Sequence, residues 1–549
     1  MPDLRMPLTR LAHSPVVWIA LHAALIVVLA GGLPPDAWFS GDSGVKLIAT
    51  RGVLAHPERP MAVDIPPALA GAAAEFPQPF LALHGDHLHP MTPPLLPILT
   101  APFVALFGLH GLYVLPALGW LVSVPLTARL ARAVGARASP AAVVLAGIVA
   151  SPLLFYGLEL WEHAPAVAAV LGAAVLVFSS RPAPARALAA GACAGLAALL
   201  RPEAIWWAVA IASAGSLHHR AIRWVVPFGA GAGLLLAPLV GYNLLHFGSF
   251  GGVHVGSNVT ALGQGWLAER ASFVSMWFLP TRTVTCVLAW MLAAAHAVAW
   301  LSRRSTSGRG GPVGDVAWLV GLLSILLLMS ALAQGQEARA NLWRVFPAGL
   351  LALLPGVTMT PARRLLWILA LLPVAGVLLT TGVHGGGQWG PRYILPVVPF
   401  LLILAIDSLG ALGARFERAI IWLGFAAVVI SLVVGRTAYR DLRGSKRMYA
   451  DLAHDTAAQL QGASYVVTDV WWLGQMHAAV IDPDRILYVE PGKGAALLGR
   501  LEGPDVLLVQ ASGQDTLPPD AWVRGTCYRA GPSMPHFDGR LVATRLTCK

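Results

Sequence analysis

Residues 163–217 read HAPAVAAVLGAAVLVFSSRPAPARALAAGACAGLAALLRPEAIWWAVAIASAGSL. This stretch contains three apolar runs, and its charged residues lie only between the runs or at their ends: Arg181, Arg186, Arg201 and Glu203. An apolar helix of about 20 residues spans the hydrocarbon core of a bilayer. Apolar runs joined by short charged loops therefore predict successive membrane helices rather than the core of a soluble domain.

The same pattern extends in both directions. The 549 residues are 56% hydrophobic and 12% charged, against about 25% charged in soluble domains. The mean hydropathy is +0.67. This composition excludes a single soluble domain and a disordered chain. We predict an α-helical polytopic membrane protein with about 13 transmembrane helices, at roughly 14–33, 111–131, 140–157, 163–180, 186–200, 203–217, 224–245, 283–302, 315–333, 342–358, 365–381, 393–410 and 419–435.

The placement of arginine predicts the orientation of these helices. The run at 14–33 lacks a signal-peptidase type of site, so we interpret it as a first membrane helix. The short run at 93–107 carries four prolines and is interpreted as a half-helix that enters the membrane and returns. With a cytoplasmic N-terminus, the arginine-rich short loops then all fall inside: 129–137, 181–186, 220–223, 303–309, 363–364 and 415–418. The basic residues behind the net charge of +11 therefore serve to orient the membrane helices. They do not indicate a nucleic-acid partner.

The sequence divides into two predicted domains. Residues 1–436 form the membrane module, whose first outer loop covers about 34–92. Residues 437–549 are more polar, and short strands at 464–470, 485–489 and 505–509 predict a small α/β domain on the outer, periplasmic side. Cys527 and Cys548 both lie in this domain, where an oxidising compartment would allow a disulfide.

The first outer loop begins with Gly41-Asp-Ser-Gly-Val-Lys46. Asp42 lies between two glycines, which permit close approach of the backbone to a ligand, and its carboxylate could take a proton from an attacking hydroxyl. The alternative is a helix N-cap before the apolar residues that follow. The two interpretations are compatible, because a carboxylate has two oxygens.

The same loop ends with His84-Gly-Asp-His-Leu-His-Pro90. Its three histidines and Asp86 could bind a divalent metal ion, although the spacing matches no standard zinc motif. The alternative places His84 and His89 as polar groups at the membrane surface, with Asp86 in a turn after Gly85. No other residues indicate a cofactor.

Two further outer loops carry charge near the membrane. The second is Glu159-Leu-Trp-Glu-His-Ala-Pro165, where Glu159, Glu162 and His163 either serve the site or solvate the end of a helix in an interfacial belt. The third holds Arg201 and Glu203 between two apolar runs of about 15 residues, too short for a 30 Å core. Arg201 therefore lies below the surface at a helix start opened by Pro202, which suits an anion. The alternative is a local pair with Glu203.

The last outer loop, His384-Gly-Gly-Gly-Gln-Trp-Gly-Pro-Arg-Tyr393, again places an arginine, Arg392, before an apolar run. Another outer loop holds Glu337 and Arg339, which as a surface pair would contribute little. Carboxylates in the first outer loops and arginines at helix starts suit transfer of a group from a phosphate to a hydroxyl.

In their order, these motifs resemble the GT-C superfamily of membrane glycosyltransferases, in particular the bacterial protein O-mannosyltransferase, aminoarabinose transferase and lipopolysaccharide-core transferase branches. The matching stretches are Gly41–Lys46, His89-Pro-Met-Thr-Pro-Pro-Leu95, Glu159–Pro165, Gly195–Glu203 and Trp389-Gly-Pro-Arg-Tyr-Ile-Leu-Pro396.

The resemblance implies an inverting transferase of the bacterial inner membrane with a periplasmic site. Its donor would be a polyprenyl-phosphate sugar and its acceptor a hydroxyl on a glycan, lipid or protein. The resemblance makes Asp42 the general base and Arg201 and Arg392 the phosphate ligands, and it places Glu162 or Glu159 in the second acidic loop. Further contacts to donor or acceptor would come from Lys46, His84, Asp86, His89, His163, Glu203 and Tyr393. The rival interpretation is a transporter or a flippase for lipid-linked sugars, which should show repeats in two halves.

Overall fold

The structure is a computed structural model of the chain. It describes residues 15–60, 62–138, 143, 152–179, 183–253, 255, 266–305, 312–334, 338–355, 357–382, 388–501, 505–512, 527–529, 534–537 and 539–548. The chain forms two compact units. Unit 1 comprises residues 1–30, 115–241 and 258–441, and unit 2 comprises residues 31–114, 242–257 and 442–549.

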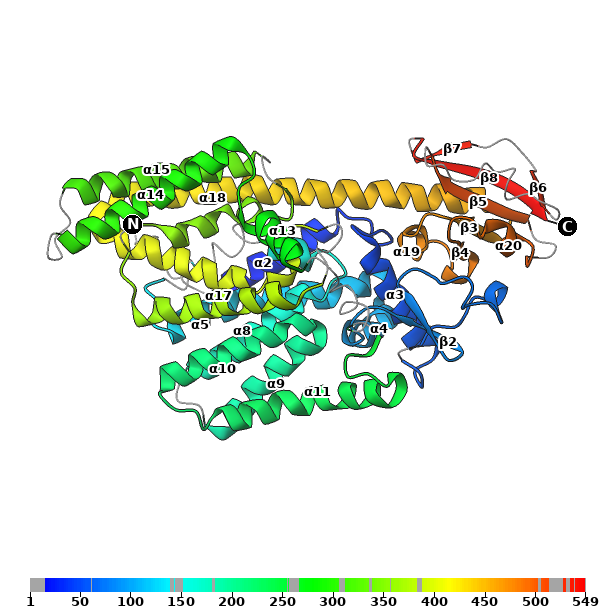
Figure 1. Ribbon diagram of the computed structural model, residues 1–549, viewed down its shortest axis with the longest axis horizontal. Coiled ribbons are helices and arrows are strands. Elements are labelled where there is room, and N and C mark those ends of the chain that lie inside the picture. The colour runs from blue at the N-terminus through cyan, green and yellow to red at the C-terminus, as the bar shows by residue number, and fades with distance from the viewer. Residues whose placement is uncertain are drawn as a thin grey trace, which may run out of the picture. The chain divides into compact units, whose positions relative to one another are not determined.

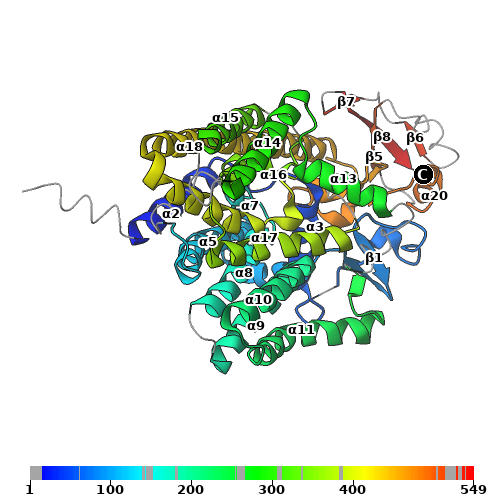
Figure 2. The same ribbon diagram turned by 60° about the vertical axis from the view of Figure 1, so that its left-hand side comes forward.

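Unit 1 is built from apolar helices (Figures 1 and 2). In the described part of the chain, six helical segments are long and apolar enough to cross a membrane, and the chain is a multi-pass membrane protein. The longer helices that lie wholly or mostly in this unit, together with the short α7, are α2 (Pro15–Ala30), α5 (Val114–Ala133), α7 (Leu153–Gly157), α8 (His163–Phe178), α9 (Pro184–Leu200), α10 (Ile205–His219), α11 (Val225–Phe247), α13 (Trp266–Phe278), α14 (Thr283–Ser305), α15 (Pro312–Ala333), α17 (Pro361–Thr380) and α18 (Val397–Gln459).

Most predicted apolar runs coincide with one of these helices, but the predicted span at 342–358 is wrong. There the chain forms a single turn, α16 (Leu342–Val345), and a 3-10 segment, η4 (Pro347–Leu353). The side chain of Asn341 accepts hydrogen bonds from the amides of Trp343 and Arg344 and starts α16. Pro347 has no amide hydrogen to continue it. The predicted run at 140–157 lies largely outside the described residues.

The two last predicted runs, 393–410 and 419–435, both belong to α18. Although this element is helical from Val397 to Gln459, a Cβ on Gly424 would lie 3.9 Å from Cδ1 of Leu409. Fifteen residues of straight helix would separate these positions by about 22 Å. The chain therefore turns back between them, and the two runs pack against each other as separate segments.

Small residues allow the helices of unit 1 to approach closely. Gly191 and Gly195 of α9 face the backbone of α11 at Phe228 and Ala232, where any Cβ at position 191 would collide with the carbonyl oxygen of Phe228. Four-residue spacing of glycines is typical of tight helix pairs in membranes.

The helices α14 and α15 also lie side by side in both views (Figures 1 and 2).

Arg363 was expected in a cytoplasmic loop, but it lies in the first turn of α17 and is 4% exposed. Its Nη1 donates to Oδ2 of Asp407 at 3.0 Å, and the same carboxylate accepts the amide hydrogen of Arg137 at 2.7 Å. A buried charge is retained only when it is paired and hydrogen-bonded. Arg363 therefore joins helices inside the bundle.

Unit 2 contains the first long predicted loop and the C-terminal segment. Residues 34–92 form α3 (Gly41–Ala55), the 3-10 turn η1 (Pro67–Leu69) and a hairpin of β1 (Leu81–His84) and β2 (His87–Pro90). They are followed by α4 (Leu95–Phe107), a 3-10 segment η2 (Gly108–Tyr113) and, after α18, by a sheet. At about 20 Å, α4 is short for a membrane span, and it ends at Gly108 with a φ of +59°.

The sheet has the strand order β4-β3-β5-β8-β6, with β7 also paired to β8 (Figure 1). Its strands are β3 (Tyr465–Thr468), β4 (Ile486–Tyr488), β5 (Asp505–Ala511), β6 (Cys527–Arg529), β7 (Met534–His536) and β8 (Leu541–Cys548). The three predicted strands are thus present. Pairs β3–β4 and β3–β5 are parallel, whereas β8 pairs antiparallel. Short helices α19 (Leu473–His477) and α20 (Gly494–Leu498) connect the parallel strands.

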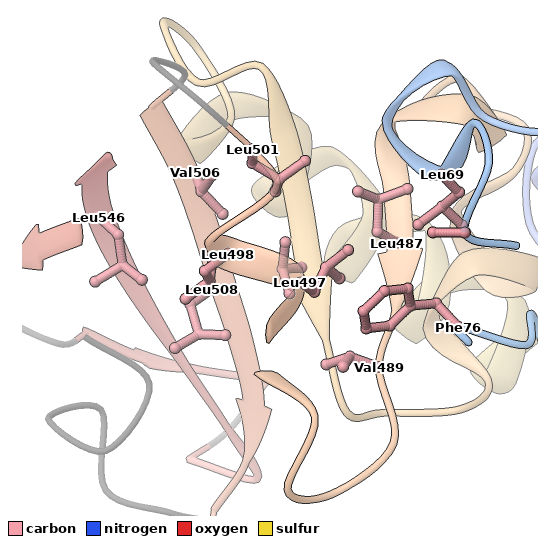
Figure 3. Close-up of a cluster of buried hydrophobic side chains, with 12 residues drawn as sticks. Leu69, Phe76, Leu487, Val489, Leu497, Leu498, Leu501, Val506, Leu508 and Leu546 are labelled. Atoms are coloured by element: carbon pink, nitrogen blue, oxygen red, sulfur yellow. The ribbon is translucent and has the colours of Figure 1, made fainter. Parts of the chain in front are cut away.

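Residues from both ends of the chain share one hydrophobic core in unit 2. Leu69 and Phe76 point toward the sheet residues Leu487, Val489 and Leu508 (Figure 3). At the edge of the sheet, Gln78 accepts the amide hydrogen of Tyr488 at 3.0 Å and donates to its carbonyl oxygen at 3.2 Å. The amide of Gln78 thereby takes the place of a further strand beside β4.

The predicted boundary between residues 436 and 437 falls inside α18, which continues to Gln459. The C-terminal segment shares its unit with residues 31–114 because the core includes Leu69 and Phe76. The register places Cys527 directly opposite Cys548, and their disulfide stays a prediction.

Candidate functional site

Arg201 lies at the point where α9 ends. It is the C-cap residue with an extended backbone (φ −142°), and Pro202 opens the 3-10 turn η3 (Pro202–Ala204) that leads into α10. The predicted break between the two short apolar runs, with proline at the first helical position, is confirmed. The break leaves the arginine side chain at a junction of helix ends.

The Arg201 side chain makes two buried ion pairs. Its Nη1 donates to Oε1 of Glu162 at 2.7 Å, and its Nε donates to Oε1 of Glu203 at 2.7 Å. The exposed fractions of the side chains are 11% for Arg201, 1% for Glu162 and 14% for Glu203. The local pair with Glu203 therefore forms as the alternative interpretation predicted, and the pair with Glu162, 39 residues away, was missed.

Arg392 provides a second buried guanidinium. It begins the 3-10 turn η5 (Arg392–Ile394) and is 8% exposed. Its Cζ lies 5.6 Å from the ring centre of Trp161 and 5.2 Å from that of Tyr393. The Cζ of Arg201 lies 5.2 Å from the same Tyr393 ring. Two buried cations thus share one phenol ring, which concentrates positive charge in a small volume.

A cluster of aromatic side chains lies beside Arg392. It consists of Tyr156, Trp161, His163 and Trp389. The hydroxyl of Tyr156 donates to the carbonyl oxygen of Trp389 at 2.8 Å, and its ring lies 4.9 Å from that of His163 and 5.2 Å from that of Trp161. Sequence reasoning missed Tyr156 and Trp389 as site residues. A hydrogen-bonding tyrosine within an apolar run was the one available signal.

The acidic second loop is buried. Glu159, Glu162 and His163 are 0%, 1% and 3% exposed, and α8 begins at His163. Solvation of a helix end at the membrane surface would require contact with water, so that alternative is wrong for all three residues. Glu162, paired with Arg201, thus forms a polar centre inside the apolar helices of unit 1.

In unit 2, Asp42 lies in the first turn of α3. The helix begins at Gly41 and its N-cap is Ser40, so the N-cap interpretation of Asp42 is wrong. A carboxylate in the first turn is still favoured by the helix dipole. Lys46 is 4% exposed, and its Nζ lies 3.4 Å from the backbone oxygen of Asp42. Gly44 packs against the backbone of Gln475, where a Cβ would collide, so its close approach serves α19 rather than a ligand.

The histidine-rich stretch forms the turn of the β1–β2 hairpin. Gly85 has a φ of +62°, as two-residue hairpin turns require, and His84 pairs with His87 across the turn. His84 and Asp86 are exposed, whereas His89 is buried and both histidine rings lie 5.0 Å from the ring of Phe247. Among the described residues, no group of three or more His, Cys, Asp or Glu side chains is placed to hold a metal ion.

The remaining predicted loop residues are only partly described. Arg339 is half-exposed and pairs with Asp441 at 3.3 Å. Its predicted partner Glu337 and the glycines that follow His384 lie outside the described residues.

A cavity of about 340 Å³ lies between α14, α15 and η4. Its lining is mostly apolar, with Leu292, Leu328 and Phe278 among the residues and Asn341 and His296 as polar groups. Phe278 is adjacent in α13 to Trp277, whose ring lies 6.2 Å from that of Tyr393. Phe278, Trp277 and Tyr393 thus form a series of neighbouring aromatic residues within unit 1. The series extends from the apolar cavity to the two arginines.

No protein-family model and no curated protein matches the sequence. Solved structures do match. The structure of ArnT, an aminoarabinose transferase from Cupriavidus metallidurans, bound to undecaprenyl phosphate is similar over 97% of this chain and 98% of its own, at 13% identity and a TM-score of 0.51. Its apo structure matches over 96% and 97%, at 13% identity and a TM-score of 0.50. An oligosaccharyltransferase, AglB from Archaeoglobus fulgidus, covers 89% of this chain and 69% of its own, at 12% identity and a TM-score of 0.42.

The two ArnT structures match nearly the whole chain. At 13% identity this likeness concerns the course of the backbone. The chain has the fold of these two ArnT structures.

Proposed function

We propose that the protein is a glycosyltransferase that moves a sugar from a polyprenyl-phosphate donor to a hydroxyl acceptor, with inversion at the anomeric carbon. The observation that carries the proposal is the pair of guanidinium groups, Arg201 and Arg392, whose Cζ atoms each lie 5.2 Å from the ring centre of Tyr393. The GT-C fold supports it, as does the ArnT structure that was solved with undecaprenyl phosphate.

The donor phosphate is assigned to Arg392, with Arg201 as the second cation. Guanidinium groups bind phosphate through several parallel hydrogen bonds, and in a buried site they act on the leaving group with little screening. Glu162 and Glu203 accept hydrogen bonds from Arg201, whereas Arg392 lies over the rings of Trp161 and Tyr393. The apolar cavity beside α13 has the volume of a small-ligand site and suits part of the polyprenyl chain.

In the proposed reaction, Asp42 accepts the proton of the acceptor hydroxyl while the oxygen attacks the anomeric carbon. The new C–O bond forms as the bond from the anomeric carbon to the phosphate oxygen breaks. The electron pair of the broken bond stays on the phosphate, and polyprenyl phosphate leaves. The arginines stabilise the charge that develops there, so the leaving group needs no proton.

The proposed setting is the bacterial inner membrane, with the N-terminus in the cytoplasm. Residues 1–436 would form the membrane module and residues 437–549 a periplasmic α/β domain. Asp42 and the second acidic loop would then face the periplasm, where the acceptor is a glycan, a lipid or a protein.

Replacing Arg392 tests the donor assignment. We expect Arg392→Gln to raise the KM for the lipid-linked donor by about 10- to 100-fold, the loss expected for a hydrogen bond to a charged group. The measurement is release of polyprenyl phosphate by purified protein from a panel of polyprenyl-phosphate sugars. Arg339→Gln is the matched control, because Arg339 is 53% exposed and should change little.

An unchanged KM for the lipid-linked donor in Arg392→Gln would exclude Arg392 as a ligand of the donor phosphate. Saturable transbilayer movement of an intact lipid-linked sugar, without cleavage, would favour a flippase and contradict the transferase.

A further inference from the structure

Unit 2 contains a narrow groove that the proposed reaction does not use. It is formed by α3, β2, α19, β4 and the turn η6 (Pro483–Arg485), and its volume is about 40 Å³. The polar and aromatic residues of its lining are Asp64, Gln78, Trp471, Gln475, Asp484 and Tyr488. A groove of this size admits the hydroxyl-bearing edge of a ring and not a whole drug-sized molecule.

Gln475 carries the strongest indication of a ligand. Its side chain is 4% exposed and lines the groove. Its Nε2 donates to the carbonyl oxygen of Pro79 at 3.0 Å. Its Oε1 is buried and has no hydrogen-bond partner among the described residues. A buried carbonyl oxygen without a donor is destabilising, and a ligand hydroxyl would supply that donor.

Two carboxylates extend this set of hydrogen-bond acceptors. Asp484 and Asp64 both line the groove, and burial together with the nearby charges of Asp482 and Asp64 raises the pKa of Asp484. Asp64 also bonds to His56 at 2.7 Å. Three acceptors facing one groove select a ligand that donates hydrogen bonds and discriminate against one that carries a phosphate or carboxylate.

An aromatic surface completes the groove. Trp471 is 53% exposed, and its ring lies 5.6 Å from that of Phe80, which limits its motion. Tyr488 lines the same groove from β4, where Gln78 holds its backbone. A half-exposed indole beside hydrogen-bond acceptors offers an apolar face for ring carbons and partners for ring hydroxyls.

We propose that this groove binds an uncharged, hydroxyl-bearing sugar ring, which stacks on Trp471 and donates hydrogen bonds to Gln475 and Asp484. That this ring belongs to the acceptor rests on the proposed function. The position of the groove supports the assignment, because a Cβ on Gly41 would lie 3.8 Å from Oε1 of Gln475. The glutamine is therefore beside the residue that precedes Asp42, and a sugar held there would present a hydroxyl near the proposed base.

The test measures sugar binding without any donor. Full-length protein in nanodiscs is examined by saturation-transfer difference NMR with methyl glucoside, methyl mannoside and methyl glucuronide. We expect binding of a neutral glycoside to wild type and at least tenfold weaker binding to Trp471→Ala and Asp484→Asn. Trp471→Phe should keep most of the affinity because it keeps an aromatic ring. Glu75→Gln, an exposed carboxylate of the same unit outside the groove, should bind as wild type does.

The charged sugar gives a second readout. The glucuronide should bind to wild type more weakly than the neutral glycosides do. In Asp484→Asn, which removes a carboxylate from the groove, the affinities for the glucuronide and the neutral glycosides should differ less. Equal binding of the neutral glycosides by wild type and both groove variants would overturn the proposal. So would tighter binding of the glucuronide than of the neutral glycosides. A serine-rich peptide is tested in the same way, and binding of this peptide without binding of any neutral glycoside would also overturn the proposal.

A kinetic measurement separates this inference from the proposed function. With a donor that is cleaved, Trp471→Ala should raise the acceptor KM while release of polyprenyl phosphate to water, in the absence of acceptor, stays unchanged. Loss of both activities together would contradict a role confined to the acceptor. If no donor is cleaved at all, the proposed function fails, and the NMR result still decides whether the groove binds sugar.

Discussion

Asp42→Asn should reduce sugar transfer by about 10²- to 10⁴-fold, the usual contribution of a positioned general base. The amide keeps the size and the first-turn position of the carboxylate in α3, but it cannot accept a proton from the attacking hydroxyl. The donor phosphate does not depend on this group, so the KM for the lipid-linked donor should stay near the wild-type value. The measurement is transfer of radiolabelled sugar to acceptor by purified protein, with wild type and variant at equal concentration.

Asp36→Asn is the control for this substitution. Asp36 lies in the same unit and pairs with His454 at 2.8 Å, and the histidine side chain is 59% exposed. An exposed pair of this kind contributes little to stability, so this variant should transfer sugar normally. Transfer by Asp42→Asn within about threefold of wild type, at equal protein levels, would exclude Asp42 as the base.

Arg201→Ala should destabilise the protein as well as weaken catalysis. It removes the guanidinium that pairs with Glu162, whose side chain is 1% exposed, and breaking a buried ion pair by removing one partner costs about 3–5 kcal/mol. We therefore expect a clearly lower midpoint of thermal unfolding in detergent for Arg201→Ala than for wild type. Arg339→Ala, which breaks the half-exposed pair with Asp441, should lower the midpoint only slightly.

A double substitution identifies the cause. Adding Glu162→Gln to Arg201→Ala removes the stranded charge, so the double variant should recover much of the lost stability, although not the activity. An Arg201→Ala protein as stable as wild type would show that the buried pair contributes no net stability.

The apolar runs of the sequence predicted most helices because a membrane helix must satisfy its own backbone and bury an apolar surface. The break at Arg201 was predictable for the same reason, since two short runs met at a proline. The error at 342–358 arose where Asn341 and Pro347 set local backbone structure inside an apolar stretch. Hydropathy does not register such effects.

The contacts of the site were harder to predict. The pair of Arg201 and Glu162 joins residues 39 positions apart, and the alternative interpretation of Arg201 named only the nearer Glu203 as a partner. The stacking of both arginines on Tyr393 and the bond from Tyr156 to Trp389 depend on packing between helices. Aromatic residues in membrane segments are common, so composition gave no reason to select these.

The amide of Gln78 that borders β4 has a consequence for biosynthesis. Gln78 and Tyr488 are 410 residues apart, and a ribosome adding about 5–20 residues per second needs roughly 20–80 s to make the intervening chain. Until then, Leu69 and Phe76 have no sheet to pack on. Their apolar side chains stay exposed until the strands that cover them have been translated. Assembly of this unit therefore follows synthesis of both segments, and the nascent chain is expected to need protection from aggregation or proteolysis during that interval.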